Sequence, residues 1–209
     1  MPSEPNQPDL QYQIGAVVLA AGESRRMGEP KMNLPWGNTT VVARVCEVLL
    51  ASGLEEIRVV TGGGREHVET AVQHLSVQTV FNPKFADQNM IHSLQTGIAS
   101  LSQNLKATLI VLGDQPQVEA DTIRRLTQAF QESSGSLIVP SYHNRRGHPW
   151  LVSRSLWPEI FSLRPPSTLR DFLNDHAGQI QYINLDTPTI LKDLDTPEDY
   201  ARERPQGTH

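Results

Sequence analysis

The chain has 209 residues, which is room for one large domain or two small ones. With 38% hydrophobic and 20% charged residues it has an ordinary globular composition, so extended disorder, collagen and disulfide scaffolds are excluded. The net charge of −5 gives no general case for nucleic-acid binding, because that function needs a basic surface.

The remaining composition predicts a cytoplasmic protein without membrane contact. The single cysteine, Cys46, has no internal disulfide partner, and its apolar neighbours predict a small buried residue. The longest apolar runs are far shorter than the ~20 residues of a membrane helix, and the polar start does not resemble a signal peptide. Residues 1–13 and 202–209 are predicted to be flexible tails around one domain at 14–201.

Strands and helices alternate through the first two thirds of the chain. Residues 14–20 form a continuous apolar run, which is typical of a strand buried on both faces. Further strands are predicted at 57–61, 77–81 and 108–112, and helices at 39–53, 66–75, 91–101 and 121–130. Gly53 is the expected stop of the first helix. This alternation predicts a parallel α/β sheet.

The pattern changes after Gly135. Residues 137–140 and 150–152 are expected to be short strands separated by a polar turn at 142–147, which indicates an antiparallel insertion and a mixed sheet. Helices at 169–176 and 198–204, with a strand at 180–185 between them, are expected to close the chain.

The loop after the first strand carries the first chemical signal. It reads LAAGESRRMGEPK at residues 19–31, and Arg25, Arg26 and Lys31 place three cations beside Gly22 and Gly28. Ligands of open parallel sheets bind beyond the carboxyl ends of the strands, and glycine-rich loops with cations suit phosphate groups. We therefore expect a polyphosphate site, the alternative being an ordinary solvated loop. The spacing fits neither a P-loop nor a dinucleotide motif.

Carboxylates supply the second signal. Asp114 follows the apolar run of LIVLGDQP, where it can hold a hard cation such as Mg²⁺, which takes one or two carboxylates plus phosphate oxygens. A turn or capping role for Asp114 is the alternative. In LKDLDTPEDY, Asp195 is the candidate to complete the metal site, and Asp193 is its alternative. A capping or surface role is the other reading of Asp195. Thr196 as N-cap with Pro197 explains the adjoining TPE sequence structurally.

Together, LAAG-x-S-x-R-M-G-x-x-K, GDQP and DTPED resemble the nucleotidyltransferases of molybdenum cofactor biosynthesis, the MobA/MocA-like NTP transferases, from about residue 14 to residue 200. RRGHP at 145–149 is similar to the cytidylyltransferase branch. The guanylyltransferase branch usually has LAGG where this chain has LAAG.

The resemblance implies a single-domain, Rossmann-like nucleotidyltransferase fold with a mostly parallel, mixed sheet flanked by helices. It implies catalytic roles for Arg26, Lys31 and Asp114, and Mg²⁺ ligation by Asp114 and Asp195. The nucleotide-binding residues it implies are Leu19, Ala20, Ala21, Gly22, Arg26, Lys31, Asn82 and Asp114, and the acceptor-binding residues are Ser93, Gly147, His148 and Pro149. Gly62, in the glycine run after the second strand, is expected near the nucleobase, with a plain turn as the alternative.

The implied reaction transfers CMP from CTP to molybdopterin and releases pyrophosphate. A molybdenum hydroxylase apoenzyme is a further partner. One departure concerns the acceptor: the family usually has a glycine-rich stretch before Ser93, where this chain has DQNMIH at 87–92. GTP as donor or another phosphorylated acceptor is an alternative that keeps the chemistry. A cofactor carrier without turnover is an alternative of another class.

Overall fold

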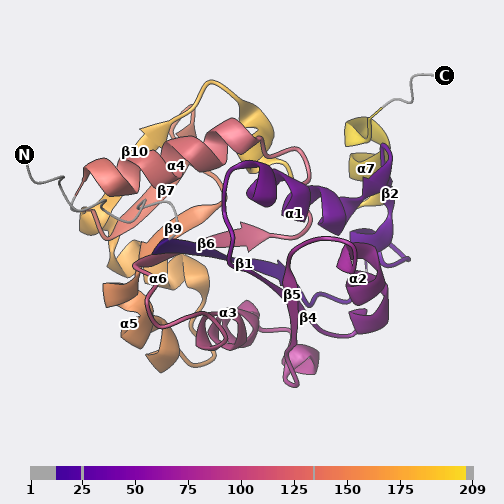
Figure 1. Cartoon of the computed structure of the whole chain (residues 1–209), viewed down its shortest axis with the longest axis horizontal. Coiled ribbons are helices and arrows are strands. Elements are labelled where there is room, and N and C mark those ends of the chain that lie inside the picture. The colour runs from indigo at the N-terminus through magenta and orange to yellow at the C-terminus, as the bar shows by residue number, and fades with distance from the viewer. Residues whose placement is uncertain (1–12, 25, 134, 206–209) are drawn as a thin grey trace, which may run out of the picture.

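The protein is built around one mixed sheet. The computed structural model describes residues 13–24, 26–133 and 135–205. Its main sheet has eight strands in the order β10-β7-β9-β6-β1-β4-β5, with β8 paired to β7. Figure 1 shows helices packed on both faces of this sheet. The tails expected at 1–13 and 202–209 fall mostly on residues outside the described part of the chain.

The strand order confirms the predicted change from parallel to mixed. The strands of the main sheet are β1 (Ile14–Ala20), β4 (Ile57–Thr61), β5 (Gln78–Phe81), β6 (Ala107–Leu112), β7 (Leu137–Tyr142), β8 (Arg145–Arg146), β9 (Trp150–Ser153) and β10 (Ile180–Asn184). β1 pairs in parallel with β4 and β6, whereas β9 runs antiparallel between β6 and β7. The segment after the predicted turn therefore inserts into the sheet as an antiparallel strand.

The apolar run of β1 is explained by burial on two faces. Ala16 and Val18 point into one hydrophobic core, and Val17 and Leu19 point into the other. All seven residues of β1 are buried. Alternate side chains leave opposite faces of a strand, so β1, which lies between two helical layers, is apolar on both faces.

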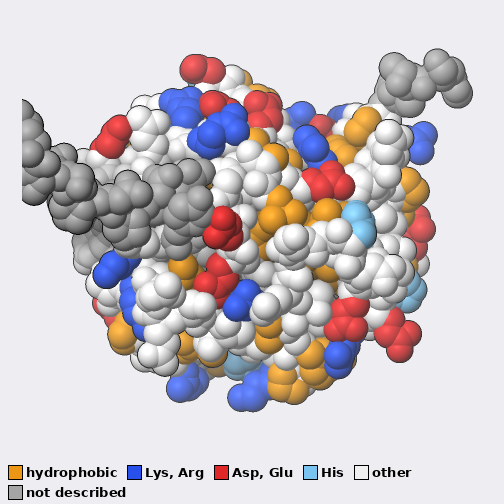
Figure 2. All heavy atoms as spheres, in the orientation of Figure 1, with side chains coloured by type: hydrophobic (Ala, Val, Ile, Leu, Met, Phe, Trp, Pro, Cys, Tyr) orange, Lys and Arg blue, Asp and Glu red, His pale blue; other side chains and the backbone are white. Residues whose placement is uncertain are grey.

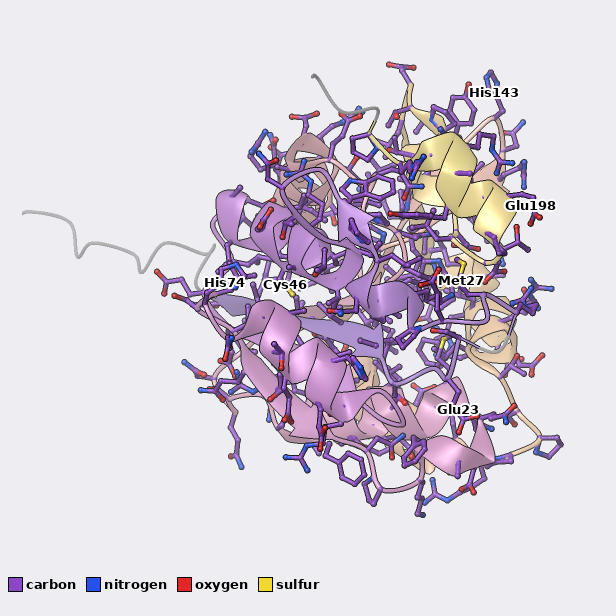
Figure 3. The ribbon with its side chains drawn as sticks, turned by 90° about the vertical axis from the view of Figure 1, so that its right-hand side faces the viewer. Glu23, Met27, Cys46, His74, His143 and Glu198 are labelled. Atoms are coloured by element: carbon purple, nitrogen blue, oxygen red, sulfur yellow. The ribbon has the colours of Figure 1, made fainter. Side chains whose placement is uncertain are left out.

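Two sets of helices form the outer layers (Figure 1). One face is covered by α1 (Val41–Ala51), α2 (Arg65–Val72) and α4 (Ala120–Glu132), and the other by α3 (Met90–Ala99), α5 (Trp157–Ser162) and α6 (Leu169–Asp175). Cys46 lies inside the first layer (Figure 3), where burial raises the pKa of its thiol to about 12. This confirms that Cys46 is a buried apolar residue.

Helix ends follow local sequence chemistry. The Thr40 side chain accepts a hydrogen bond from Ala43 N at the start of α1, and Gly53, with φ of +88°, lies just beyond its end. At α7 (Pro197–Glu203), Thr196 and Asp199 form a capping box. The structural explanation of the TPE sequence is therefore confirmed.

Helix α5, strand β8 and a small two-stranded hairpin were not predicted. The helix α5 is short, and its signal is Pro158 in the first turn. The small hairpin of β2 (Pro35–Trp36) and β3 (Thr39–Thr40) turns at Gly37, which has φ of +61°. A third cluster, which we call the junction core, joins this hairpin to the C-terminal segment and consists of Met27, Leu34, Trp36, Val41 and Leu194 with Tyr200 packed against it.

None of the helices in the described ranges is long and apolar enough to span a bilayer. On the face drawn in Figure 2, acidic and basic side chains are interspersed.

Candidate active site

A cavity of about 620 Å³ opens where the carboxyl ends of β1 and β6 lie side by side. Eight of the residues singled out in the sequence line it: Leu19, Ala21, Gly22, Arg26, Lys31, Ser93, Asp114 and Asp195. They come from four segments that are far apart in the chain. Parallel strands present their carboxyl ends at one edge, which is why these segments meet.

Ion pairs join the cationic loop to both carboxylates. The Lys31 ammonium contacts Asp114 Oδ2 and lies 3.4 Å from Asp195 Oδ1. Arg26 Nη2 lies 3.0 Å from Asp195 Oδ2. The Lys31 and Asp114 side chains are only 13% and 15% exposed, so solvent screens their attraction less than it would at the surface. The expected juxtaposition of cations and carboxylates is therefore present.

The loop after β1 is folded so that Lys31 turns back toward the sheet. Ser24, with φ of +53°, accepts a hydrogen bond from Lys31 N at 3.0 Å, and Gly28 has φ of +77°. Met27 is buried in the junction core and anchors the loop. Figure 3 shows Glu23 and Met27 of this loop on the same side of the molecule as Glu198 of α7. Arg25 lies outside the described residues.

Asp193 also lines the cavity, so both aspartates that the sequence left as alternatives lie there. Gln115 Nε2 donates a hydrogen bond to Asp193 Oδ1 at 2.6 Å. Burial, together with the nearby carboxylates of Asp114 and Asp195, raises the pKa of Asp193, while the Gln115 hydrogen bond opposes that rise.

Part of the cavity wall is apolar and was mostly missed from the sequence. It includes Met32, Phe85, Met90 and Leu112. The stretch that departs from the family pattern contributes Gln88, Asn89 and Met90 to this wall. That departure was the available signal, since residues bulkier than glycine before Ser93 necessarily change the shape of the wall.

Three further candidates lie behind the lining. Ala20 is buried in β1, and Gly62 packs against Ala21 so closely that an added Cβ would also lie 2.7 Å from Phe85 Cβ. Asn82 is 1% exposed, and its Nδ2 donates a hydrogen bond to Ser93 Oγ at 3.0 Å. Asn82 and Gly62 therefore support residues that line the cavity.

The GHP segment also stands outside the lining. Gly147 N donates to Pro140 O and His148 N to Ile190 O, so the segment holds the chain that leads to Asp193. His148 stacks on Trp150 with ring centroids 4.3 Å apart, and burial lowers the pKa of its imidazole to about 4. Contact of Gly147, His148 and Pro149 with an acceptor stays a prediction.

The residues present fit a divalent cation. Asp114 and Asp195 both direct an oxygen to one positive group, the Lys31 ammonium, which marks a point where two carboxylates meet. No group of three or more His, Cys, Asp or Glu side chains in the described ranges forms an all-protein cage. Two carboxylates are the protein share typical of a Mg²⁺ site completed by phosphate oxygens and water.

Comparison with known proteins places this geometry in a family. The family described as MobA-like NTP transferase domain matches residues 16–180. The chain belongs to the MobA-like NTP transferase family. Its membership confirms the resemblance drawn from the three sequence segments, and it makes the protein a nucleotidyltransferase.

Two similar proteins match nearly the whole chain. Molybdenum cofactor cytidylyltransferase of Escherichia coli (strain K12) is 26% identical over 195 residues, covering 91% of this chain and 96% of that protein. Purine catabolism protein PucB of Bacillus subtilis (strain 168) is 28% identical over 206 residues, covering 92% and 96%.

Solved structures agree with the fold. Rv0371c from Mycobacterium tuberculosis H37Rv superposes with a TM-score of 0.80 at 29% identity, covering 92% of this chain and 97% of that one. A complex of Rv0371c with manganese superposes with a TM-score of 0.74 at 27% identity, covering 91% and 97%. The single-domain, mostly parallel α/β nucleotidyltransferase fold expected from the sequence is thereby confirmed.

Proposed function

We propose that this nucleotidyltransferase transfers CMP from CTP to molybdopterin in the cytoplasm, with Mg²⁺ and with release of pyrophosphate. The observation that carries the proposal is the meeting of Arg26 and Lys31 with Asp114 and Asp195 in one cavity. Cations to hold a triphosphate and carboxylates to hold a metal are thus present within a few ångströms of one another.

The proposed reaction needs no protein nucleophile. A terminal phosphate oxygen of molybdopterin attacks the α-phosphorus of CTP, a new P–O bond forms, and the bond to the leaving pyrophosphate breaks. Lys31 and Arg26 exchange their carboxylate partners for phosphate oxygens and neutralise the charge that develops on them. Mg²⁺, held by Asp114 and Asp195, supplies further charge neutralisation at the phosphates when bound.

A pyrimidine donor is supported by the residue at position 21. Ala21 lines the cavity, and its backbone is backed closely by Gly62. Its methyl group takes up space that a glycine leaves open in the LAGG sequence of the guanylyltransferase branch. A smaller base therefore fits the proposal better than guanine, in agreement with the name of the Escherichia coli relative.

Molybdopterin as acceptor is supported by the same relative and by the shape of the cavity. The wall formed by Phe85, Met90 and Leu112 offers apolar surface to a flat ring system, and Ser93 lies beside it. We extend the proposal to delivery of the product to a molybdenum hydroxylase apoenzyme.

Pyrophosphate release tests the proposal. The protein is incubated with Mg²⁺ and each of the four NTPs, with and without molybdopterin, and Lys106→Ala serves as a control because Lys106 is exposed at the opposite end of β6. Release that requires both CTP and molybdopterin is expected. Release with GTP only would assign the protein to the other branch, and molybdopterin binding without any turnover would favour a carrier.

A further inference from the structure

Asp114 and Asp195 lie on segments that are 81 residues apart in the chain but must face one cation. In the structure, the Lys31 ammonium bridges them. In the proposed reaction, however, Lys31 turns to the phosphates of the nucleotide, so that bridge is lost when substrate binds. Other contacts must then keep the two carboxylates together.

Two hydrogen bonds join these segments without Lys31. Leu194 N donates to Asp114 O at 3.2 Å, and Gln115 Nε2 donates to Asp193 Oδ1 at 2.6 Å. The Gln115 residue is 3% exposed, so water competes little for its amide. The two bonds join consecutive residues of one segment to consecutive residues of the other. They fix the position of the 193–195 segment against the end of β6.

We propose that Gln115 and Asp193 form a positioning clamp that holds Asp114 and Asp195 at one divalent-cation site, with Asp193 serving as hydrogen-bond acceptor and not as metal ligand. This inference rests on the proposed metal-dependent function. It assigns different roles to the two aspartates that the sequence left as alternatives. Asp195 presents its oxygens to the cation position, whereas Asp193 has one oxygen committed to Gln115.

Paired substitutions distinguish a positioning role of Gln115 and Asp193 from direct metal ligation by Asp193. Gln115→Met keeps the approximate volume but removes the donor, and Asp193→Ala removes the acceptor. Asp193→Asn keeps an acceptor oxygen and removes only the charge. Gln117→Met is the matched control, because both polar side-chain atoms of Gln117 are buried without a hydrogen-bond partner among the described residues.

The primary measurement is Mn²⁺ binding. It is monitored by the loss of the EPR signal of free Mn²⁺ as the 209-residue protein is titrated. The apparent KM for Mg²⁺ in pyrophosphate release and the thermal melting curve are recorded for the same variants. Gln115→Met and Asp193→Ala are each expected to weaken Mn²⁺ binding about 10- to 100-fold, the usual effect of losing an outer-shell partner. The double variant should lose no more than either single variant.

The affinities of Asp193→Asn and Gln117→Met for Mn²⁺ are expected to lie within about twofold of the wild-type affinity. This difference is small beside the loss of about 10- to 100-fold that is expected for the other two variants. Wild-type affinity in Gln115→Met would overturn the clamp. A loss in Asp193→Asn as large as in Asp193→Ala would overturn the division of roles and make Asp193 a ligand. Absence of Mn²⁺ binding in the wild-type protein would overturn the metal-dependent function together with the clamp. If Gln115→Met does not fold, the comparison of Asp193→Asn with Asp193→Ala still decides.

Discussion

Lys31 is the residue on which the charge balance of the site depends. Its ammonium touches Asp114, lies 3.4 Å from Asp195, and is mostly shielded from solvent. A group in this position is neutralised by the carboxylates, and in the proposed reaction it turns to phosphate when a metal takes its place beside them. We therefore expect its contribution to catalysis to be made mainly in the transition state.

We expect Lys31→Ala to lower kcat by about 100-fold or more, the usual cost of removing one preorganised charge-stabilising group. The KM for CTP should rise by less, because Arg26 remains beside the phosphates. Steady-state pyrophosphate release measures both, with Lys106→Ala as the control. An unchanged kcat would show that Lys31 makes no contact in the transition state.

Asp114→Ala is expected to abolish turnover while leaving the fold intact. The carboxylate is at the end of β6, outside the three hydrophobic clusters, so few packing contacts are lost. Circular dichroism should match the wild-type spectrum, and pyrophosphate release should be undetectable. Retained turnover would refute the assignment of Asp114 to the metal.

His148 makes stability depend on pH. Burial lowers the pKa of its imidazole from 6.5 to about 4, so the unfolded chain binds a proton between these values that the folded protein does not. The stability of the folded protein is therefore unaffected by this group above pH 6.5, and it decreases as the pH falls from 6.5 toward 4. The free energy of unfolding is measured with urea at several pH values for the wild-type protein and for His148→Phe, which keeps an aromatic ring against Trp150. Between pH 4 and 6.5, the free energy should depend more steeply on pH in the wild-type protein than in the variant. Equal slopes would contradict a buried neutral imidazole.

At the scale of elements, α3 shows how close packing positions the site. Gly97 lies where the helix crosses the central strands, and an added Cβ would meet Val17 and lie 2.9 Å from Val60 Cγ2. The same helix carries Ser93 and Met90 into the cavity. A glycine at the crossing lets the helix approach the sheet, and the first turn of the helix then reaches the cavity.

Gly97→Ala is expected to destabilise the protein by about 1–3 kcal/mol, the usual cost of overpacking a core. The matched control is Gly178→Ala, because an added Cβ at Gly178 would meet no atom within 4 Å. Urea unfolding measures both variants. A loss of the same size at Gly178 would mean that backbone effects and not packing are responsible.

Much of this architecture is predictable because burial leaves a periodic signal. The continuous apolar run of β1 and the helical spacing around Cys46 identified central elements correctly. Helix α5 was not predicted because its six residues are too few to show the helical spacing of apolar residues. The ion-pair partners could be predicted from the loops because the carboxyl ends of parallel strands meet at one edge of the sheet, where ligands bind.

The supporting contacts were not predictable from the sequence. The Gln115–Asp193 hydrogen bond joins residues 78 positions apart, and the apolar wall around Phe85 depends on how a loop folds over the sheet. Likewise, nothing in the spacing of RRGHP showed that its backbone would bind Ile190 instead of facing the cavity. Such contacts follow from tertiary packing, which local pattern does not encode.

At the scale of the whole molecule, the site forms where a segment near the N-terminus meets a segment near the C-terminus. The junction core packs Met27 and Trp36 of the first loop region against Leu194, and Tyr200 OH donates a hydrogen bond to Pro35 O at 2.6 Å. Residues from both sides of this junction line the cavity, so a ligand that bridges them stabilises the packed form of the whole chain.

We therefore expect CTP with Mg²⁺ to raise the melting temperature. At a ligand concentration of about 100 times Kd the stabilisation is about 2.7 kcal/mol, or roughly 5–10 °C for a chain of this size. Differential scanning fluorimetry with CTP plus EDTA provides the control, which should give a smaller shift. Equal shifts with and without the metal would argue against a shared metal–nucleotide site.

The pairing of Arg26 and Lys31 with Asp195 and Asp114 has a consequence for how the nucleotide arrives. The described lining holds more acidic than basic side chains, so we expect long-range electrostatic steering to contribute little to the capture of an anionic nucleotide. Under the proposed function, binding is an exchange of partners, in which the metal–nucleotide complex brings both the anion that the cations need and the cation that the aspartates need. A nucleotide without its metal would leave the aspartates without a cation, and a metal without its nucleotide would leave Arg26 and Lys31 without an anion. We therefore expect the site to prefer the complete complex over either component.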